Sequence, residues 1–374
     1  MKLKEIDNLK RRSKQRQGLN ALLAGLISAS LLLGTSCGRK TETPEPSKSV
    51  PAVSAAPSPS ATPSSTPAPT AKPRELSPFS GSELPAAIRN RRPLCIMIDN
   101  HEAARPQAGL NAADLVFEMP VEGGISRYMA VFQSREPERV GPVRSARDCF
   151  LDRMLELQGI YVHFGGSYPA LDRIATEAYE TLDGLVYCGD GSAIYRDDST
   201  GKWAPHNAYA DPARLRELAD SLGYAPERAA GAPGYRFRES AETPKGQSAE
   251  TIRLSFSDAN ETSFSYVKDE GLYHIYKDGE EQADEDSGEA MVCRNVVIQF
   301  VPVSLYDPPL LLVEQSGEGE GWYASMGRIQ PIRWKKSGER DLTRYYDAKG
   351  DEILLNPGQT RIEVLAPDRD VSYD

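Results

Sequence analysis

Histidine and cysteine are scarce in this chain of 374 residues, which has four of the first and five of the second. No two cysteines have the CxxC spacing of a zinc site, and no helical HExxH pair is present. A G-x-S-x-G segment is missing too, so a hydrolase with a nucleophile elbow has no direct support. The sequence therefore predicts neither a metal nor a cofactor.

Basic residues are also fewer than acidic ones. The chain has 44 Lys and Arg and 54 Asp and Glu, which gives a formal net charge of −10. The first 36 residues hold seven basic and two acidic side chains, a balance of +5, so the rest of the chain carries −15. Nucleic-acid binding relies on Lys and Arg to neutralise phosphates. Adhesion to anionic lipid needs basic side chains as well. We therefore expect no nucleic-acid partner and no attachment to a membrane through charge.

A long apolar run is missing as well. The apolar stretch 21–33 has 13 residues, whereas a helix needs about 20 to cross a bilayer. It follows a basic segment and precedes the small residues 34–36, the order of a secretory signal peptide over residues 1–36. Cys37 comes next and predicts a thiol that receives lipid (palmitate) and becomes the mature N-terminus. This segment resembles the lipobox of bacterial lipoproteins, although Gly34 stands where leucine is usual. Ordinary secretion is the alternative.

Residues 37–84 are predicted to form a disordered tether. Nine prolines lie between residues 44 and 73 among Ser, Thr and Ala, with almost no large apolar side chains. Such a segment buries too little surface to offset its ordering entropy. Proline favours an extended form of about 3.1 Å per residue, so the tether can span roughly 100 Å. We expect a head held away from the extracytoplasmic face of the cell membrane; glycosylation of the tether stays open.

Four cysteines remain after Cys37, and their redox state is not fixed by the sequence. An even number in an exported protein permits disulfides with three connectivities. Cys95 and Cys293, however, lie inside apolar runs typical of strands, where a free cysteine behaves as a small buried apolar side chain. We favour free thiols, and Cys149 and Cys188 complete the set.

The region 85–243 alternates strands with helices. Strands are predicted at 94–98, 115–119, 128–133 and 160–164, and helices at 145–157, 169–177 and 212–221. Ser145 is the predicted N-cap of the first helix, with Asp148 three positions later. The alternation favours an α/β domain with a mixed sheet.

The region 244–374 has short strands separated by turns instead. Strands are predicted at 252–256, 264–268, 272–276, 291–301, 310–313, 328–334 and 361–365, and turns at 278–279, 316–319 and 347–350. The charged run 280–289 is predicted to be a solvated loop. The predicted fold class is therefore α+β, with an N-terminal α/β domain followed by an antiparallel β-rich domain.

Polar residues gather in the first region where predicted strands end and helices begin. Ligands of α/β sheets bind at such places, helix N-termini attract anions, and guanidinium groups match phosphate and carboxylate. The candidate ligand-binding residues are Asp99, Asn100, Arg105, Arg127, Arg144, Ser145, Arg147, Gly165, Gly166, Ser167 and Asn207. Each also has a structural interpretation: the serines are then plain helix caps, and Arg127 pairs with Glu118 or Glu122.

Several segments resemble those of a known family. They are residues 98–133 (IDNHEAARPQAGLNAADLVFEMPVEGGISRYMAVFQ), GPVRSARD, YVHFGGS and APHNAY. They resemble the YerB lipoprotein family of Gram-positive bacteria, and the similarity extends over about residues 90–370. RNVVIQF and GEGEGWYASMGRIQPIRWKK match in the second region, with Arg294 where lysine is usual. The resemblance implies a surface location and a two-domain layout, and no established reaction.

Three functions remain open. The first, which we favour, is binding of an anionic cell-envelope ligand, such as a wall glycopolymer or peptide, through the arginines. The second is a hydrolase acting on a cell-wall or lipid-linked substrate, with Glu118 or Glu122 as base and His163 or His206 as proton carrier. The third is a scaffold that binds another envelope protein.

Overall fold

The computed structural model describes residues 76–374, so the predicted signal peptide, Cys37 and residues 37–75 of the predicted tether lie outside the described residues. Residues 76–84 differ from the prediction, because they pack onto the folded part of the chain. Phe79 is fully buried beneath the guanidinium of Arg228, and the Ser77 hydroxyl donates to Gln133 Oε1 at 3.2 Å. The burial of Phe79 thus makes the last residues of the predicted tether part of the fold.

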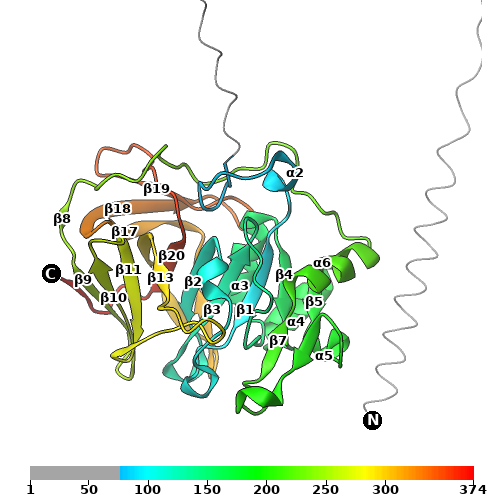
Figure 1. Cartoon of the computed structure of the whole chain (residues 1–374). Coiled ribbons are helices and arrows are strands. Elements are labelled where there is room, and N and C mark those ends of the chain that lie inside the picture. The colour runs from blue at the N-terminus through cyan, green and yellow to red at the C-terminus, as the bar shows by residue number, and fades with distance from the viewer. Residues whose placement is uncertain (1–75) are drawn as a thin grey trace, which may run out of the picture. The chain divides into compact units, whose positions relative to one another are not determined.

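Four strands of the first region form the centre of the structure (Figure 1). They are β1 (Leu94–Ile98), β2 (Leu115–Pro120), β3 (Ser126–Phe132) and β4 (Ile160–His163). β1 pairs antiparallel with β3 and parallel with β4, which in turn pairs parallel with β5 (Thr181–Asp183). The sheet is therefore mixed, as predicted.

The remaining elements of this region are short. The helices are α2 (Ala86–Arg89), α3 (Asp148–Leu157), α4 (Tyr168–Glu177), α5 (Gly184–Tyr187) and α6 (Pro212–Ser221), with 3₁₀ turns at Glu102–Ala104, Leu110–Ala112, Glu122–Gly124 and Asp198–Thr200. A small hairpin joins β6 (Ile194–Arg196) to β7 (Ala208–Ala210). α6 has the predicted bounds, and Asp211 caps it by accepting from the backbone N–H of Arg214.

The second region is built almost entirely of strands. They are β8 (Gln247–Ser248), β9 (Thr251–Ser257), β10 (Asn260–Val267), β11 (Leu272–Lys277), β12 (Glu280–Glu281), β13 (Val292–Cys293), β14 (Asn295–Phe300), β15 (Val303–Asp307), β16 (Leu310–Val313), β17 (Gly317–Ser325), β18 (Arg328–Lys336), β19 (Arg344–Tyr346), β20 (Thr360–Leu365) and β21 (Val371–Tyr373). Between β11 and β12, Asp278 and Gly279 have φ of 53° and 84°. Two positive φ values in a two-residue hairpin loop match the predicted turn.

One 11-stranded sheet takes strands from both regions, in the order β19-β18-β17-β14-β20-β2-β3-β1-β4-β5, with β8 beside β18. β20, from the end of the chain, pairs parallel with β2 on one side and with β14 on the other (Figure 1). The predicted fold class is confirmed. The predicted domain boundary between residues 243 and 244 does not separate two sheets, because strands from both sides of it belong to this one sheet.

The large sheet buries both faces. Ile96 and Ile98 of β1 join a cluster with Leu254 and Phe264 of the six-stranded sheet that contains β9, β10 and β11. Met97, on the opposite face, joins a cluster with residues of α3. Covering both faces explains why β1 is a continuous apolar run rather than an alternating one.

Three local predictions differ from the structure. α3 begins at Asp148 with Arg147 as N-cap, so Ser145 is not its cap. In the segment 316–319, predicted as a turn, residues 317–319 belong to β17. In the predicted solvated loop, Asp284 is buried and accepts from the backbone N–H of Gly109.

Cys95, Cys149, Cys188 and Cys293 are free thiols in the structure, as favoured above. Along residues 76–374, none of the helices combines the length and the apolar character needed to cross a bilayer.

Candidate functional site

Three distant segments meet at the carboxyl end of β1. Asp99 follows this strand, and its side chain is only 1% exposed. Its Oδ2 atom lies 3.1 Å from Arg144 Nε and 2.8 Å from His206 Nδ1. Arg144 is held in place because its backbone N–H donates to Met97 O at 2.8 Å, beside the end of β1. A buried carboxylate thus orients one guanidinium and one imidazole, which we call the Asp99 cluster (Asp99, Arg144 and His206).

The tautomer of His206 follows from this contact. A carboxylate only accepts hydrogen bonds, so Nδ1 of His206 carries the proton, and Nε2 has a free lone pair in the neutral ring. The ring stacks on that of His101 with 4.9 Å between centroids. His101 is itself fixed, because its N–H donates to Asp99 Oδ1 at 3.1 Å and its Nδ1 accepts from Ala103 N. His101 is not among the predicted site residues, although its position two residues after Asp99 was a usable signal.

Arg127 lies near this cluster and is buried. Its Nη1 atom donates to the carbonyl of Ser145 at 2.9 Å, and it forms no ion pair within residues 76–374. The alternative pairing with Glu118 or Glu122 is therefore wrong. Burial and then the charge of Arg147 lower the pKa of Arg127 to about 10, so it remains a cation at neutral pH. It adds positive charge close to the cluster, and the charges of Asp99 and Glu122 act on it without forming an ion pair.

Arg147 is bound by Glu122. Arg147 Nε lies 2.8 Å from Glu122 Oε2, and Nη2 contacts Oε1, so the pair is bidentate. Burial opposes ionisation of Glu122, but the hydrogen bond and charge of Arg147 outweigh it and lower the pKa to about 2. Such an acid is a poor proton acceptor at neutral pH, which argues against Glu122 as a catalytic base.

The turn after β4 supports the segment that carries the arginines. His163 is buried, and its Nδ1 lies 2.9 Å from the carbonyl of Gly165. Burial lowers its pKa, which keeps the ring neutral. That carbonyl also accepts from Ala146 N at 2.8 Å, and Gly165 N donates to Asp183 Oδ1 at 2.7 Å. His163 is thus a packing residue here and not an accessible proton carrier.

The next two residues act through the backbone. A Cβ on Gly166 would lie 3.1 Å from that of Ala146, so glycine allows this close approach. Ser167 is the N-cap of α4 without a side-chain capping bond, and its N–H donates to Ala146 O at 3.1 Å. The strand end and the helix start are thus tied to the segment 144–147.

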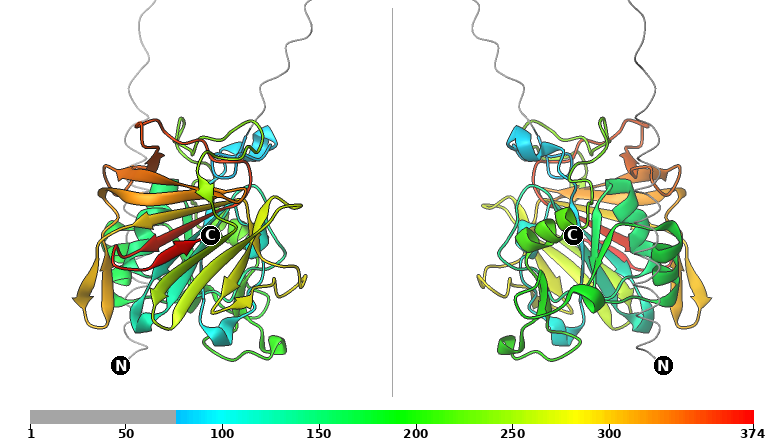
Figure 2. Two further views of the ribbon diagram at one scale, coloured as in Figure 1. Left: turned by 90° about the vertical axis from the view of Figure 1, so that its left-hand side faces the viewer. Right: turned by 90° about the vertical axis from the view of Figure 1, so that its right-hand side faces the viewer.

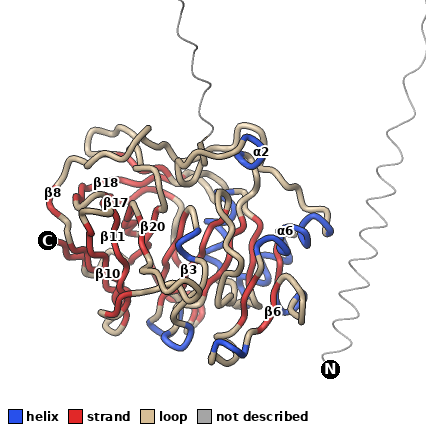
Figure 3. The backbone as a smooth tube through the Cα atoms, in the orientation of Figure 1, coloured by secondary structure: helices blue, strands red, loops and turns tan. Residues whose placement is uncertain are grey.

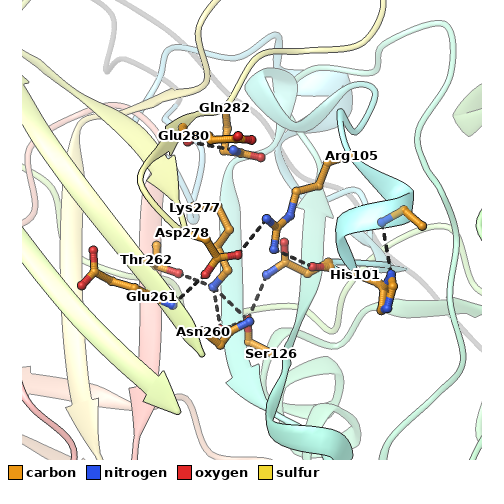
Figure 4. Close-up of polar contacts among 12 residues, drawn as sticks. His101, Arg105, Ser126, Asn260, Glu261, Thr262, Lys277, Asp278, Glu280 and Gln282 are labelled. Atoms are coloured by element: carbon orange, nitrogen blue, oxygen red, sulfur yellow. Dashed lines mark hydrogen bonds and ion pairs between the residues drawn. The ribbon is translucent and has the colours of Figure 1, made fainter. Parts of the chain in front are cut away.

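Other candidates belong to a buried network between β2 and the six-stranded sheet. Lys277 Nζ lies 2.8 Å from Glu118 Oε1. It also lies 2.6 Å from Thr262 Oγ1, a contact that Figure 4 shows. Asn100 Nδ2 donates to the same Glu118 oxygen at 3.1 Å. Burial disfavours ionisation of Glu118, but the charge of Lys277 outweighs it and lowers the pKa. Glu118 is fully buried and ion-paired, so it is not an accessible base.

Arg105 and Asn207 also lie outside the cluster. Arg105 Nη1 pairs with Asp278 of the hairpin after β11 at 2.9 Å, and Nη2 donates to Asn100 O at 3.0 Å (Figure 4). Asn207 is buried and bonds Arg196 and Asp198, both at 2.6 Å. These two residues fix local structure rather than face a ligand.

The candidate set therefore divides. Asp99, Arg144 and His206 converge, with Arg127 and the Arg147–Glu122 pair adjacent. Asn100, Arg105, Glu118, His163 and Asn207 are structural. In the stretch from residue 76 to the C-terminus, no three His, Cys, Asp or Glu side chains gather in a way that would hold a metal ion.

Comparison with known proteins identifies the family to which the chain belongs. The N-terminal domain of a protein family of unknown function, DUF3048, matches residues 79–225, and its C-terminal domain matches residues 252–362. The chain belongs to this two-part family. It is 30% identical over 300 residues to "Putative lipoprotein YerB" of Bacillus subtilis (strain 168), over 79% of this chain and 87% of the relative. It also matches the crystal structure of the YerB protein from Bacillus subtilis with a TM-score of 0.71 and 27% identity, over 79% of this chain and 99% of that chain. The resemblance noted in the sequence is confirmed.

Proposed function

We propose that this protein is a lipid-anchored envelope protein that binds a phosphate- or carboxylate-bearing ligand at the Asp99 cluster. The lipid anchor is supported by the signal-peptide pattern before Cys37 and by the name of the Bacillus subtilis relative. The proposed location is the extracytoplasmic face of the cell membrane, where envelope polymers are accessible.

One observation carries the binding proposal: a single buried carboxylate presents a guanidinium and an imidazole together. The side chains of Arg144 and His206 are 25% and 13% exposed, whereas Asp99 beneath them is 1% exposed. An anion can therefore reach the guanidinium of Arg144 without displacing the carboxylate, and Nε2 of His206 can accept a hydrogen bond from a hydroxyl group of the ligand. Side chains that are already fixed lose little entropy on binding, which favours affinity.

The charge balance around the cluster agrees with an anionic ligand. Arg127, Arg144 and Arg147 contribute three positive charges, and Asp99 and Glu122 contribute two negative ones. The balance of these five side chains is +1, in a protein whose overall charge is −10. Local positive charge on an acidic protein attracts an anion to this place rather than to the surface at large.

A hydrolase is the second candidate, and the Asp99–His206 contact favours it. A carboxylate that orients an imidazole through Nδ1 leaves Nε2 to take a proton from water or from a substrate hydroxyl. Arg144 would then stabilise the developing negative charge. This assignment differs from the predicted one, in which Glu118 or Glu122 was the base.

The test is a titration of residues 71–374, of which residues 76–374 form one compact unit, with phosphorylated wall-polymer fragments and with the same fragments after phosphate removal. We expect binding of the phosphorylated fragments alone, weakened about ten-fold or more by Arg144→Ala, which corresponds to about 1.4 kcal/mol. Arg214→Ala is the matched control, because Arg214 is 51% exposed and pairs with Asp211 away from the cluster.

The outcomes separate the three functions. Equal binding by wild type and Arg144→Ala rejects the anion site. Release of a product, lost in His206→Gln but retained in Arg214→Ala, favours the hydrolase. Absence of both binding and product leaves the scaffold.

A further inference from the structure

The hairpin of β15 and β16 stands apart from both main sheets. The two strands form a two-stranded sheet of their own, and Figure 2 shows it as the gold hairpin that projects at the outer edge of each view. Leu305 and Tyr306 on β15 are 64% and 60% exposed. Soluble proteins seldom expose neighbouring large apolar side chains on a strand unless a partner covers them.

The apolar surface continues onto α4. Tyr168, the first residue of that helix, is 57% exposed, and its hydroxyl donates to Asp307 Oδ2 of β15 at 2.9 Å. Leu312 on β16 is exposed as well. We call Tyr168, Leu305, Tyr306 and Leu312 the hairpin patch.

A cavity lies on each side of the hairpin. The smaller, of about 260 Å³, is bounded by Tyr306, Leu311 and Leu312 on the side of α3 and α4. The larger, of about 390 Å³, is bounded by Val303, Leu305 and Leu311. Both reach Glu122 in the turn between β2 and β3. Side chains of an added segment therefore have a recess on either face of the hairpin.

β15 also has an open edge. Within residues 76–374 it pairs with β16 and with no other strand. An extended polypeptide can add to such an edge through its main chain, while alternate side chains enter the pockets on the two faces. A two-stranded hairpin is only marginally stable alone, so a third strand would also stabilise it.

The charge around the patch selects the kind of partner. Asp172 lines the smaller cavity and Asp307 lies on β15, and neither forms an ion pair within the described chain. Asp148, in the same cavity, is paired with Arg173 at 3.2 Å, and the one arginine there, Arg147, is held by Glu122. A second copy of this acidic chain or an anionic lipid surface would meet like charge.

We propose that the hairpin patch is the docking site for an extended segment of another protein that alternates apolar and basic side chains and adds as a strand to β15. Its apolar side chains pack on Leu305 and Tyr306, and its Lys or Arg side chains pair with Asp172 and Asp307. This proposal does not rest on the proposed anion site.

The experiment measures binding of ten-residue peptides to residues 71–374 by fluorescence anisotropy. The probe alternates Leu with Lys; one comparison peptide alternates Leu with Glu, and another is the Leu/Lys peptide N-methylated at alternate residues. We expect the Leu/Lys peptide to bind at least about ten-fold more tightly than either comparison peptide. The Leu/Glu peptide lacks the positive charge, and the N-methylated peptide lacks the main-chain N–H donors at alternate residues. Tyr306→Asp should weaken binding by a similar factor.

Val186→Asp is the matched control, because Val186 on α5 is 69% exposed and lies outside the patch. It should bind like wild type, and thermal melting should show that both variants fold. The proposal is overturned if the Leu/Glu or the N-methylated peptide binds equally well, if no peptide binds at 1 mM, or if Tyr306→Asp has no effect. Dimerisation of the wild type that Tyr306→Asp abolishes would instead assign the patch to a second copy.

Discussion

Replacing Lys277 by methionine should strongly destabilise the fold, because it leaves Glu118 charged in a dry environment. Both side chains are fully buried, and the Nζ–Oε1 distance is 2.8 Å. Removing one partner of a buried ion pair typically costs about 3–5 kcal/mol. Lys277 also donates to Asn260 and Thr262, whose oxygens lose a hydrogen bond, so we expect the upper half of that range. Urea unfolding followed by circular dichroism measures the loss.

A double variant tests the cause. Lys277→Met combined with Glu118→Leu removes both charges and should recover about half or more of the loss, since apolar pairs of similar volume often replace buried ion pairs without cost. If the two single losses simply add, the pair is not coupled and the reasoning fails. A loss below about 1 kcal/mol for Lys277→Met would refute it as well, because a pair worth so little behaves like an exposed one.

Three further predictions concern stability. Glu122→Gln should lower the free energy of unfolding by about 1–2 kcal/mol at pH 7 after allowance for solvent screening; because the folded pKa of Glu122 is depressed to about 2, the difference from wild type should shrink as the pH falls from 4.5 to 2 in urea titrations. Glu363→Gln should stabilise the fold increasingly as the pH rises above 4.5. Burial and then the charge of Glu118 raise the pKa of Glu363, so the folded wild type must either retain a proton or bury a charge. A pH-independent effect of the substitution would contradict this. Phe79→Ala should cost about 3–5 kcal/mol in the same assay, as for other buried aromatics, whereas an effect below 1 kcal/mol would mean that residues 76–84 do not belong to the fold.

The sequence predicts those strands whose pattern reflects their burial. β1 has the predicted bounds because both of its faces are covered, and α6 has them because Asp211 and Pro212 mark its start. β17 was missed because its glycines resemble a turn. A Cβ at Gly319 would lie 2.6 Å from the Trp334 indole nitrogen, and one at Gly321 would lie 2.2 Å from Ile298 O. These glycines permit close packing of β17 against neighbouring residues. The local sequence pattern does not reveal this packing, because the contacting residues Trp334 and Ile298 lie elsewhere along the chain.

The site was predictable in its location and not in its pairing. Strand ends indicated Asp99, and loops indicated Arg144 and His206. Which carboxylate meets which cation depends on the register of distant strands. Glu118 is at the end of a strand in the sequence, but β20 lies beside it and Lys277 of β11 reaches it. A residue that looked like a base is therefore buried by segments more than 140 positions away.

The turn between β2 and β3 connects the two proposed binding sites. Glu122 binds Arg147 next to the anion site, and it also borders both cavities of the hairpin. A Lys or Arg of a docked segment would compete with Arg147 for Glu122, and Arg147 would then be released to attract an anion. Because linkage is reciprocal, an anion that binds Arg147 should in turn leave Glu122 to the docked segment. The two ligands are therefore expected to strengthen each other's binding, and Glu122→Gln should remove this effect while leaving the Asp99 cluster unchanged.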